Sequence, residues 1–196
     1  MSTLMIEPET DVSAEFQRRR FTVEEFQRMG EAGILAPEER VELIDGEVVQ
    51  MTPVGARHNW SVIDLTEHLM RLTGDELQLA VQCSLQVGSE QLSPDFAMLR
   101  RGGRRDRVPQ PEDCVLAVEV AESSVSFDTR FKARKYASVA IPEYWVLDLP
   151  KDRVLVYRRP EGGLYRETVA HARGASFTSP ALGGRTIQVA DVLGAR

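Results

Sequence analysis

The stretch Cys114-Val-Leu-Ala-Val-Glu-Val-Ala121 decides the fold, because it is apolar at every position except Glu119. Apolar runs of this length are typical of strands that are covered on both faces. Side chains alternate along a strand, so Glu119 shares its face with the small residues Ala117 and Ala121. A buried carboxylate costs several kcal/mol without a compensating cation, so the run predicts either a metal site or a glutamate paired with an arginine.

The composition is that of an ordinary globular protein. Of 196 residues, 42% are hydrophobic and 28% are charged, which is enough to bury a substantial core. The net charge of −6 argues against coating of nucleic acid through bulk charge, but it is compatible with a local basic patch. Cys83 and Cys114 are the only cysteines, too few for a disulfide framework or a zinc motif, and we expect both in the core.

The organisation along the chain predicts a flexible N-terminal arm over residues 1–20 and one mixed α/β domain over residues 21–196. No apolar stretch resembles the core of a signal peptide or reaches the ~18 residues of a membrane span. We therefore expect a cytoplasmic protein.

Capping and turn signals place the first elements. Thr22 with Glu25 forms a capping box and predicts a helix over residues 23–32. Asp45-Gly46 predicts a hairpin. A second helix is expected to carry Val62, Leu65, Leu69 and Leu72 at helical spacing and to end at Gly74. The other expected elements are one long or two short strands over 77–87, strands over 94–99 and 114–121, a helix over 128–139, a hairpin of 143–148 with 153–157, and short strands after it.

Asp95 is the natural partner of Glu119. It begins the strand that precedes the Glu119 strand, and strands that flank a loop usually lie side by side. The two carboxylates can therefore converge on one end of the sheet. Two carboxylates completed by water make a typical Mg²⁺ or Mn²⁺ site, and such a metal polarises a phosphate and activates water. Ser93-Pro94-Asp95 alone is also a common turn, so the pair of acids carries the prediction.

The expected helix over residues 128–139 adds cations. Asp128, Lys132, Lys135 and Tyr136 lie within helical reach of one another. A lysine that reaches a metal-bound phosphate stabilises its developing negative charge or positions the attacking water. The alternative is a solvated basic face, with Asp128 near the start of the helix.

The loop over residues 100–112 is rich in arginine and joins the two strands that carry the acids. Its cations are Arg100, Arg101, Arg104, Arg105 and Arg107, and Gly102 and Gly103 lie between them. We expect this loop close to the site, where arginines would bind phosphates, and a solubilising loop is the alternative. Tyr144-Trp145 lies in an apolar strand, which favours the core or a dimer interface over a platform for stacked bases.

Several short motifs follow one another in a specific order. They are Val41-Glu-Leu-Ile-Asp-Gly-Glu47, His58, Ser93-Pro-Asp-Phe96, Val118-Glu-Val120, Asp128-x3-Lys132-x3-Tyr136-Ala137 and Ile141-Pro-Glu-Tyr-Trp-Val-Leu-Asp148. Over about residues 21 to 158 this series resembles the bacterial Uma-type family of endonucleases, part of the PD-(D/E)XK restriction-endonuclease-like superfamily. The resemblance implies a mixed α+β fold: a central mixed sheet flanked by helices, here with a β-rich C-terminal extension.

The resemblance also implies a divalent metal, Mg²⁺ or Mn²⁺, held by acids on adjacent strands. Asp95 matches the first acid of the motif and Glu119 the second, so both are expected to bind the metal and to act in catalysis. Ala121 stands where a lysine would complete Glu-x-Lys. Lys132 on the following helix matches the place of the displaced lysine, and Lys135 is the alternative.

Two further residues match the family at its early segment. Glu42 would add a metal ligand or orient water, or else it is an edge-strand glutamate beside the hairpin. His58, near the start of the second helix, is either a structural hydrogen-bonding residue or a group that transfers a proton.

The sequence thus predicts a metal-dependent phosphodiester hydrolase, an endonuclease acting on nucleic acid and preferentially DNA. Asp95 and Glu119 would bind Mg²⁺, Lys132 would stabilise the transition state and Glu42 would assist; a homodimer is compatible with this class. A catalytically silent nucleic-acid-binding or regulatory domain is the main alternative, favoured by Ala121 and the negative net charge. A hydrolase of small phosphoesters is the third. No groove-reading helix is recognisable, so the sequence predicts no base specificity.

Overall fold

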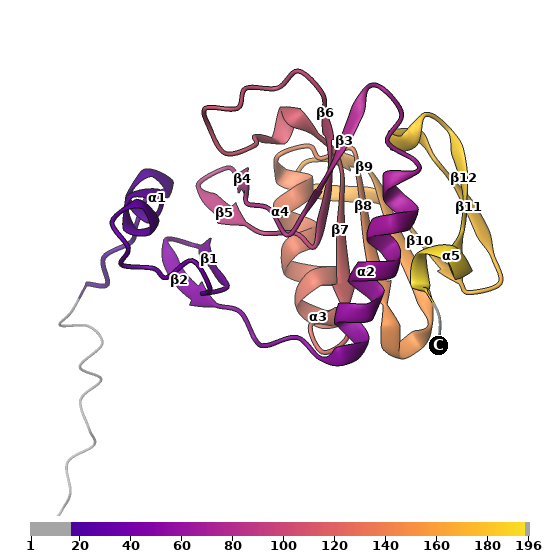
Figure 1. Ribbon diagram of the computed structural model, residues 1–196, viewed down its shortest axis with the longest axis horizontal. Helices are drawn as coiled ribbons and strands as arrows, with labels where there is room; N and C mark the ends of the chain where they lie inside the picture. Colours follow the sequence, from indigo (N-terminus) through magenta and orange to yellow (C-terminus); the bar gives the residue numbers. More distant parts are fainter. Residues whose placement is uncertain (1–16, 195–196) are drawn as a thin grey trace, which may run out of the picture.

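The computed structural model describes residues 17–194. In chain order the elements are α1 (Val23–Glu31), β1 (Val41–Ile44), β2 (Glu47–Gln50), α2 (Ala56–Met70), β3 (Leu77–Val81), β4 (Leu85–Val87), β5 (Glu90–Leu92), β6 (Phe96–Arg100), β7 (Cys114–Ala121), α3 (Val125–Phe127), α4 (Ala133–Ser138), β8 (Glu143–Asp148), β9 (Arg153–Glu161), β10 (Leu164–Ala172), β11 (Ser176–Ser179), β12 (Arg185–Gln188) and α5 (Val189–Leu193). Figure 1 shows a central sheet with helices packed on it and the α1, β1 and β2 segment to one side.

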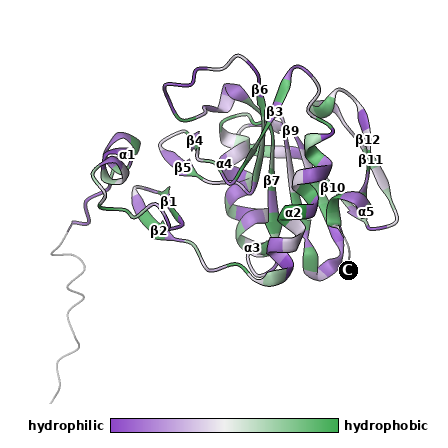
Figure 2. Ribbon diagram, in the orientation of Figure 1, coloured by the Kyte–Doolittle hydropathy of each residue, from purple (hydrophilic) through white to green (hydrophobic). Residues whose placement is uncertain are grey.

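The central sheet has six strands in the order β10-β9-β8-β7-β6-β3. The β7 and β8 strands are parallel, and the other neighbouring pairs are antiparallel. The β7 strand lies inside this sheet and all eight of its residues are buried, in agreement with its apolar sequence (Figure 2). The predicted mixed sheet flanked by helices is confirmed.

The two faces of β7 pack against different helices. Leu116, Val118 and Val120 belong to the core beneath Leu65 and Leu69 of α2. The opposite face, with Ala117 and Ala121, belongs to the core that contains Tyr136 of α4. Glu119 alternates with the alanines, so its side chain lies on the α4 face, where the small neighbours leave space.

A second sheet, in the order β2-β1-β5-β4, contributes to the same region. Its first hairpin turns at Asp45 and Gly46, whose φ angles of 48° and 75° are those of a type I′ turn. The predicted hairpin is thereby confirmed. The short strand β5 was not predicted, and it pairs with β1 through Leu43 and Gln91. Because β1 is therefore an inner strand, the interpretation of Glu42 as an edge-strand glutamate is wrong.

Other predictions differ in detail from the structure. The capping box at Thr22 is confirmed, and α1 ends one residue before the predicted boundary. The predicted helix over 128–139 begins instead at Val125 and contains a π-helical turn, Asp128–Lys132. The predicted strand region 77–87 divides into β3 and β4, which belong to different sheets.

Cys114 is buried as expected, whereas Cys83 is only partly buried. Most of the predicted N-terminal arm, residues 1–16, lies outside the described residues. The boundary of the domain at residue 21 stays a prediction. No helix within residues 17–194 is long and apolar enough to cross a membrane.

The two tryptophans of the chain test the packing of the central sheet. Trp145 is fully buried and packs edge-on against Phe177, whereas Trp60 on α2 is 65% exposed. We expect Trp145→Ala to lower the free energy of unfolding by about 3 to 5 kcal/mol, because it leaves a cavity in the core. Trp60→Ala should change it by less than about 0.5 kcal/mol. Urea denaturation measures both, and equal losses would contradict this placement of the core.

Candidate functional site

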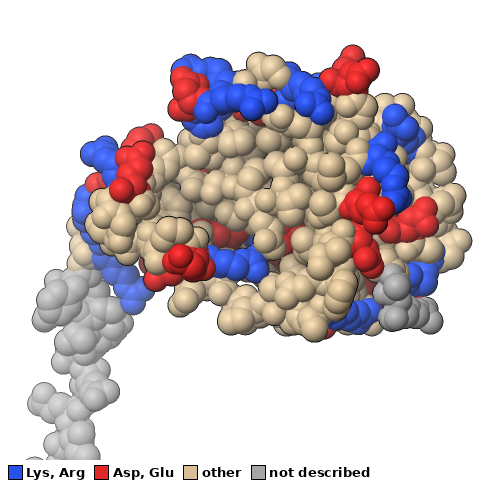
Figure 3. Space-filling model, in the orientation of Figure 1, with Lys and Arg blue, Asp and Glu red and all other residues tan. Residues whose placement is uncertain are grey.

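A cleft of about 910 Å³ lies where α1, β1, β2, the start of α2 and the end of β7 meet. Figure 3 shows Asp and Glu side chains (red) inside the hollow between the α1, β1 and β2 segment and the part of the protein that contains the central sheet. The predicted residues that line the cleft are Glu42, His58, Asp95, Glu119, Asp128 and Lys132. Segments between Phe26 and Lys132 that are far apart in sequence therefore contribute to one site.

The register of the central sheet brings Asp95 to Glu119. Phe96 pairs with Val118 across the antiparallel β6 and β7 strands, so one further step places Asp95 opposite Glu119. Side chains at opposite positions of a sheet point to the same face. The Oδ2 atom of Asp95 accepts a hydrogen bond of 2.9 Å from the backbone N–H of Val120, which fixes the aspartate against β7.

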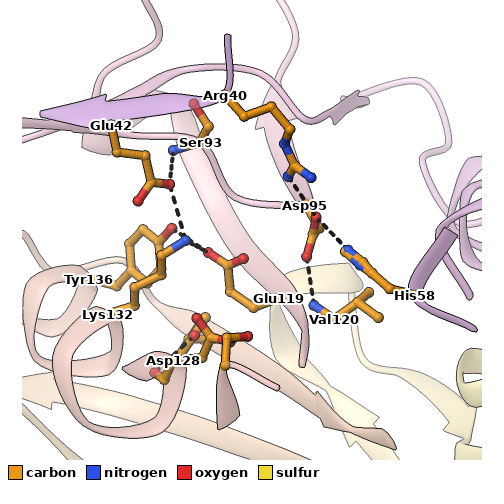
Figure 4. A network of polar contacts seen from close by, with 12 residues as sticks. Arg40, Glu42, His58, Ser93, Asp95, Glu119, Val120, Asp128, Lys132 and Tyr136 are labelled. Atoms are coloured by element: carbon orange, nitrogen blue, oxygen red, sulfur yellow. Dashed lines mark hydrogen bonds and ion pairs between the residues drawn. The ribbon is translucent and has the colours of Figure 1, made fainter. Parts of the chain in front are cut away.

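Lys132 reaches the same place from the helical side (Figure 4). Its Nζ atom donates to Oε1 of Glu119 at 3.0 Å and to Oε1 of Glu42 at 3.1 Å. The hydroxyl of Tyr136 also donates to Oε1 of Glu119, at 3.0 Å. Lys132 ends the π-helical turn, and such single turns are frequent at functional sites because they redirect the side chains they carry.

Glu42 connects the second sheet to this group. Its Oε1 atom accepts from the backbone N–H of Ser93 at 2.8 Å as well as from Lys132. Its Oε2 atom is buried and has no hydrogen-bond partner among the described residues. A buried carboxylate oxygen without a donor is costly, so Glu42 Oε2 is available for a cation or a water.

Two further cationic or titratable groups face Asp95. The Nε2 atom of His58 lies 3.3 Å from Oδ1 of Asp95, and Nη2 of Arg40 lies 3.9 Å from the same oxygen. His58 is buried and its contact lacks hydrogen-bond geometry, whereas the Arg40 side chain is 41% exposed. Sequence reasoning missed Arg40, because an arginine that precedes a strand carries no motif signal.

The electrostatics of the cleft are dominated by buried carboxylates. Burial raises the pKa of Glu119 well above its usual range; Lys132 opposes this shift, and the neighbouring acids add to it. Burial likewise raises the pKa of Asp128 to about 6, again against the effect of Lys132. Burial alone would lower the pKa of Lys132, but Glu119, Glu42 and Asp128 raise it, so the ammonium stays charged.

Negative charge is therefore in surplus at this site. Four buried carboxylates, those of Glu42, Asp95, Glu119 and Asp128, line the cleft together with Lys132, which is the only buried lysine or arginine among residues 17–194. Such a surplus favours binding of a cation or a proton. The structure also keeps Tyr136 neutral, because burial and Glu119 raise its pKa well above the usual range. It is thus a hydrogen-bond donor at any ordinary pH.

Two sequence-based placements are wrong. The arginine-rich loop leaves the C-terminal end of β6 and enters the N-terminal end of β7, whereas Asp95 and Glu119 lie at the other ends of these antiparallel strands. None of its arginines lines the cleft. Lys135, the alternative lysine, instead pairs with Asp45 and Glu90 and does not line the cleft either.

Tyr144 and Trp145 are fully buried in the core.

The fold and the site define a class of protein. A mixed sheet flanked by helices, with acids where two neighbouring strands meet, is the arrangement of restriction-endonuclease-like proteins. The chain is similar to the crystal structure of a "putative nuclease belonging to DUF820" from Anabaena variabilis, with a TM-score of 0.69 and 15% sequence identity. The match covers 88% of this chain and 97% of that one, and it establishes a shared fold.

The sequence places the chain more narrowly. Residues 23–190 match the model of the Uma2 family, which is described as "Putative restriction endonuclease". The chain belongs to the Uma2 family, which confirms the resemblance seen in its motifs. The comparison with curated proteins finds no match.

The raised pKa of Asp128 gives a prediction for stability. Because the folded protein holds a proton that the unfolded chain releases, the free energy of unfolding should fall as the pH rises from about 4 to about 6. A shift of about two pKa units corresponds to about 3 kcal/mol. We expect Asp128→Asn to flatten the decline in this window by about that amount, measured by urea denaturation at a series of pH values.

A matched control is Asp106→Asn. Asp106 is exposed, and the side chain of Arg104 lowers its pKa, so its loss should leave the decline between about pH 4 and 6 in place. An unchanged profile in Asp128→Asn would show that this carboxyl group does not carry the charge surplus of the cleft.

Proposed function

We propose that this chain is a metal-dependent nuclease that hydrolyses phosphodiester bonds of nucleic acid, with DNA as its substrate. The observation that carries the proposal is the convergence of Asp95, Glu119 and Lys132 in one cleft that holds a surplus of negative charge. Membership of the Uma2 family supports a nuclease of the restriction-endonuclease class.

The donor set fits a divalent cation such as Mg²⁺ or Mn²⁺. Asp95 and Glu119 would hold it, and the free Oε2 atom of Glu42 is a further oxygen donor at the same cleft. Within residues 17–194 no three His, Cys, Asp or Glu side chains are grouped so that they could hold a metal ion together. A cation held by Asp95 and Glu119 would therefore take its other ligands from water and substrate phosphates, as Mg²⁺ commonly does in proteins.

When bound, the metal polarises the phosphate and lowers the pKa of a coordinated water. The protein's own residues would do the remaining work. Lys132 stays protonated, and its ammonium would stabilise the negative charge that develops on the phosphate in the pentacoordinate transition state. Glu42 and Tyr136 act as positioning residues, because Glu42 anchors the ammonium to the Ser93 backbone and Tyr136 orients Glu119.

The position of Lys132 bears on the alternative of a silent binding or regulatory domain. Ala121 occupies the position on β7 where the Glu-x-Lys motif has its lysine. The missing lysine favoured the interpretation of a catalytically silent domain. Lys132 nevertheless places its ammonium 3.0 Å from Glu119, so the charge is supplied from the helix. This contact supports the enzyme over the silent domain. A homodimer stays a prediction.

The proposal predicts cleavage of plasmid DNA that requires Mg²⁺ or Mn²⁺ and stops when EDTA is added. Glu119→Gln should lower the rate by at least about 100-fold, since several kcal/mol of metal-dependent stabilisation are lost. Lys132→Met should lower it by about 100-fold through loss of one charged donor. Cleavage is followed by gel electrophoresis under single-turnover conditions.

An ion pair between a buried glutamate and a partly exposed lysine provides the control. Glu90 and Lys135 form an ion pair outside the cleft, so Glu90→Gln and Lys135→Met disturb a similar contact without touching the site. Both should cleave like the wild type. Wild-type protein that binds DNA but never cleaves it with either metal would favour the silent domain. Cleavage of a chromogenic diester without cleavage of DNA would favour the small-phosphoester hydrolase.

A further inference from the structure

The arginine-rich loop, residues Arg100–Arg107, lies at the end of the central sheet opposite to the cleft. It emerges from β6 at the top of Figure 1, whereas α3, which follows the Glu119 end of β7, lies at the bottom. Asp95 and Arg101 are six residues apart on the extended β6 segment, which corresponds to roughly 20 Å. The loop is therefore a separate surface and not part of the cleft wall.

This loop concentrates positive charge on an acidic protein. It contains five arginines and one aspartate and thus carries a net charge of +4, in a chain whose net charge is −6. Arg104 pairs with Asp106, and Arg107 pairs with Glu112 and Asp113. Arg100, Arg101 and Arg105 are exposed and form no ion pair within the described part of the chain.

The exposed arginines are presented by a segment that is fixed at both ends. The backbone N–H of Arg101 donates to the carbonyl of Glu76, which holds the start of the loop beside β3. At the other end the carbonyl of Pro109 accepts from the backbone N–H of Gln86, and the Gln110 side chain donates to the Gln86 side chain. Between these anchors Gly102 adopts a φ of 82°, a backbone conformation that favours glycine.

We propose that the Arg100–Arg107 loop is a second contact for the phosphate backbone of nucleic acid, remote from the cleft. This proposal rests on the proposed function, because it assigns the polymer a path from the cleft to the loop. Guanidinium groups bind phosphate oxygens in pairs of hydrogen bonds, and such contacts position nucleic acid without reading its sequence.

The distances explain why a remote contact would be useful. The acidic cleft repels a polyanion, so binding energy for the polymer has to come from elsewhere. At about 0.1 M salt, charges separated by more than about 10 Å are largely screened from each other. The loop lies about twice that distance from the acids. Its attraction for phosphate is therefore not cancelled by the cleft, and a strand would span the gap with about six nucleotides.

The test compares two triple variants of the full chain. Arg100→Gln, Arg101→Gln and Arg105→Gln together remove the unpaired cations of the loop. Arg134→Gln, Arg166→Gln and Arg185→Gln remove the same charge from exposed positions on α4, β10 and β12. Binding to a fluorescent duplex of about 20 base pairs is measured by anisotropy, with EDTA present, between about 50 and 200 mM salt. Thermal unfolding verifies that each variant is folded.

We expect the loop variant to bind about tenfold or more weakly at low salt. Its slope of log K against log salt should be smaller by about 2 to 3, because each arginine removed leaves about one phosphate without its neutralising cation. In the cleavage assay it should raise KM and leave kcat near the wild-type value, because the loop does not touch the reacting phosphate. The control variant should show a slope of log K against log salt that is close to the wild-type slope.

Equal slopes in the loop variant and the control would overturn the proposal, and so would wild-type protein that binds no duplex at all. These failures are distinct from failure of the proposed function. A reduced slope without any cleavage by the wild type would remove the nuclease and keep the loop contact. Normal metal-dependent cleavage with an unchanged slope would do the reverse.

Discussion

The buried ammonium of Lys132 is the contact on which the arrangement of the site depends. It joins Glu42 of β1 to Glu119 of β7, and the helical segment that carries it packs over the same face of the central sheet. Three parts of the chain that are far apart in sequence therefore meet at one charge. Without that charge two buried carboxylates would face each other uncompensated, at a cost of several kcal/mol.

A buried network of this kind is poorly explained by stability alone. Burying ions costs as much as their attraction returns, and apolar side chains of the same size often give a more stable protein. Here the compensation is also incomplete, because Glu119 and Asp128 both have raised pKa values. Carboxyl groups with perturbed pKa values that gather in a cleft are characteristic of functional sites. There the arrangement of charges favours binding of a ligand over the stability of the free protein.

Much of the fold was predictable from local signals. The Asp45-Gly46 turn, the Thr22 capping box and the apolar β7 strand each correspond to a strong rule of backbone geometry or burial. The short β5 strand was not predictable, because three residues with two polar side chains lack a strand pattern, and pairing with β1 and β4 stabilises it. The π-helical turn was missed as well, since its sequence is compatible with an ordinary helix.

The residues of the site were predictable from the sequence. The choice between the two lysines and the position of the arginine-rich loop were not. Adjacent strands brought Asp95 to Glu119, and helical spacing offered Lys132 and Lys135 without choosing between them. The structure separates these lysines, because only Lys132 turns toward β7. The arginine loop was misplaced for a topological reason. Connecting two strands does not bring a loop to their functional ends when the strands are antiparallel and the acids lie at the ends away from the connection.

The central claim is that the carboxylates of the cleft are completed by a divalent cation. The most direct test is calorimetric titration of the wild-type protein and Glu119→Gln with Mn²⁺, because it requires no knowledge of the substrate. With only two carboxylates as ligands, we expect the wild type to bind Mn²⁺ with a Kd in the micromolar to millimolar range and Glu119→Gln to lose binding. Wild-type protein that binds no Mn²⁺ would contradict the account and leave Glu119 as a structural partner of Lys132.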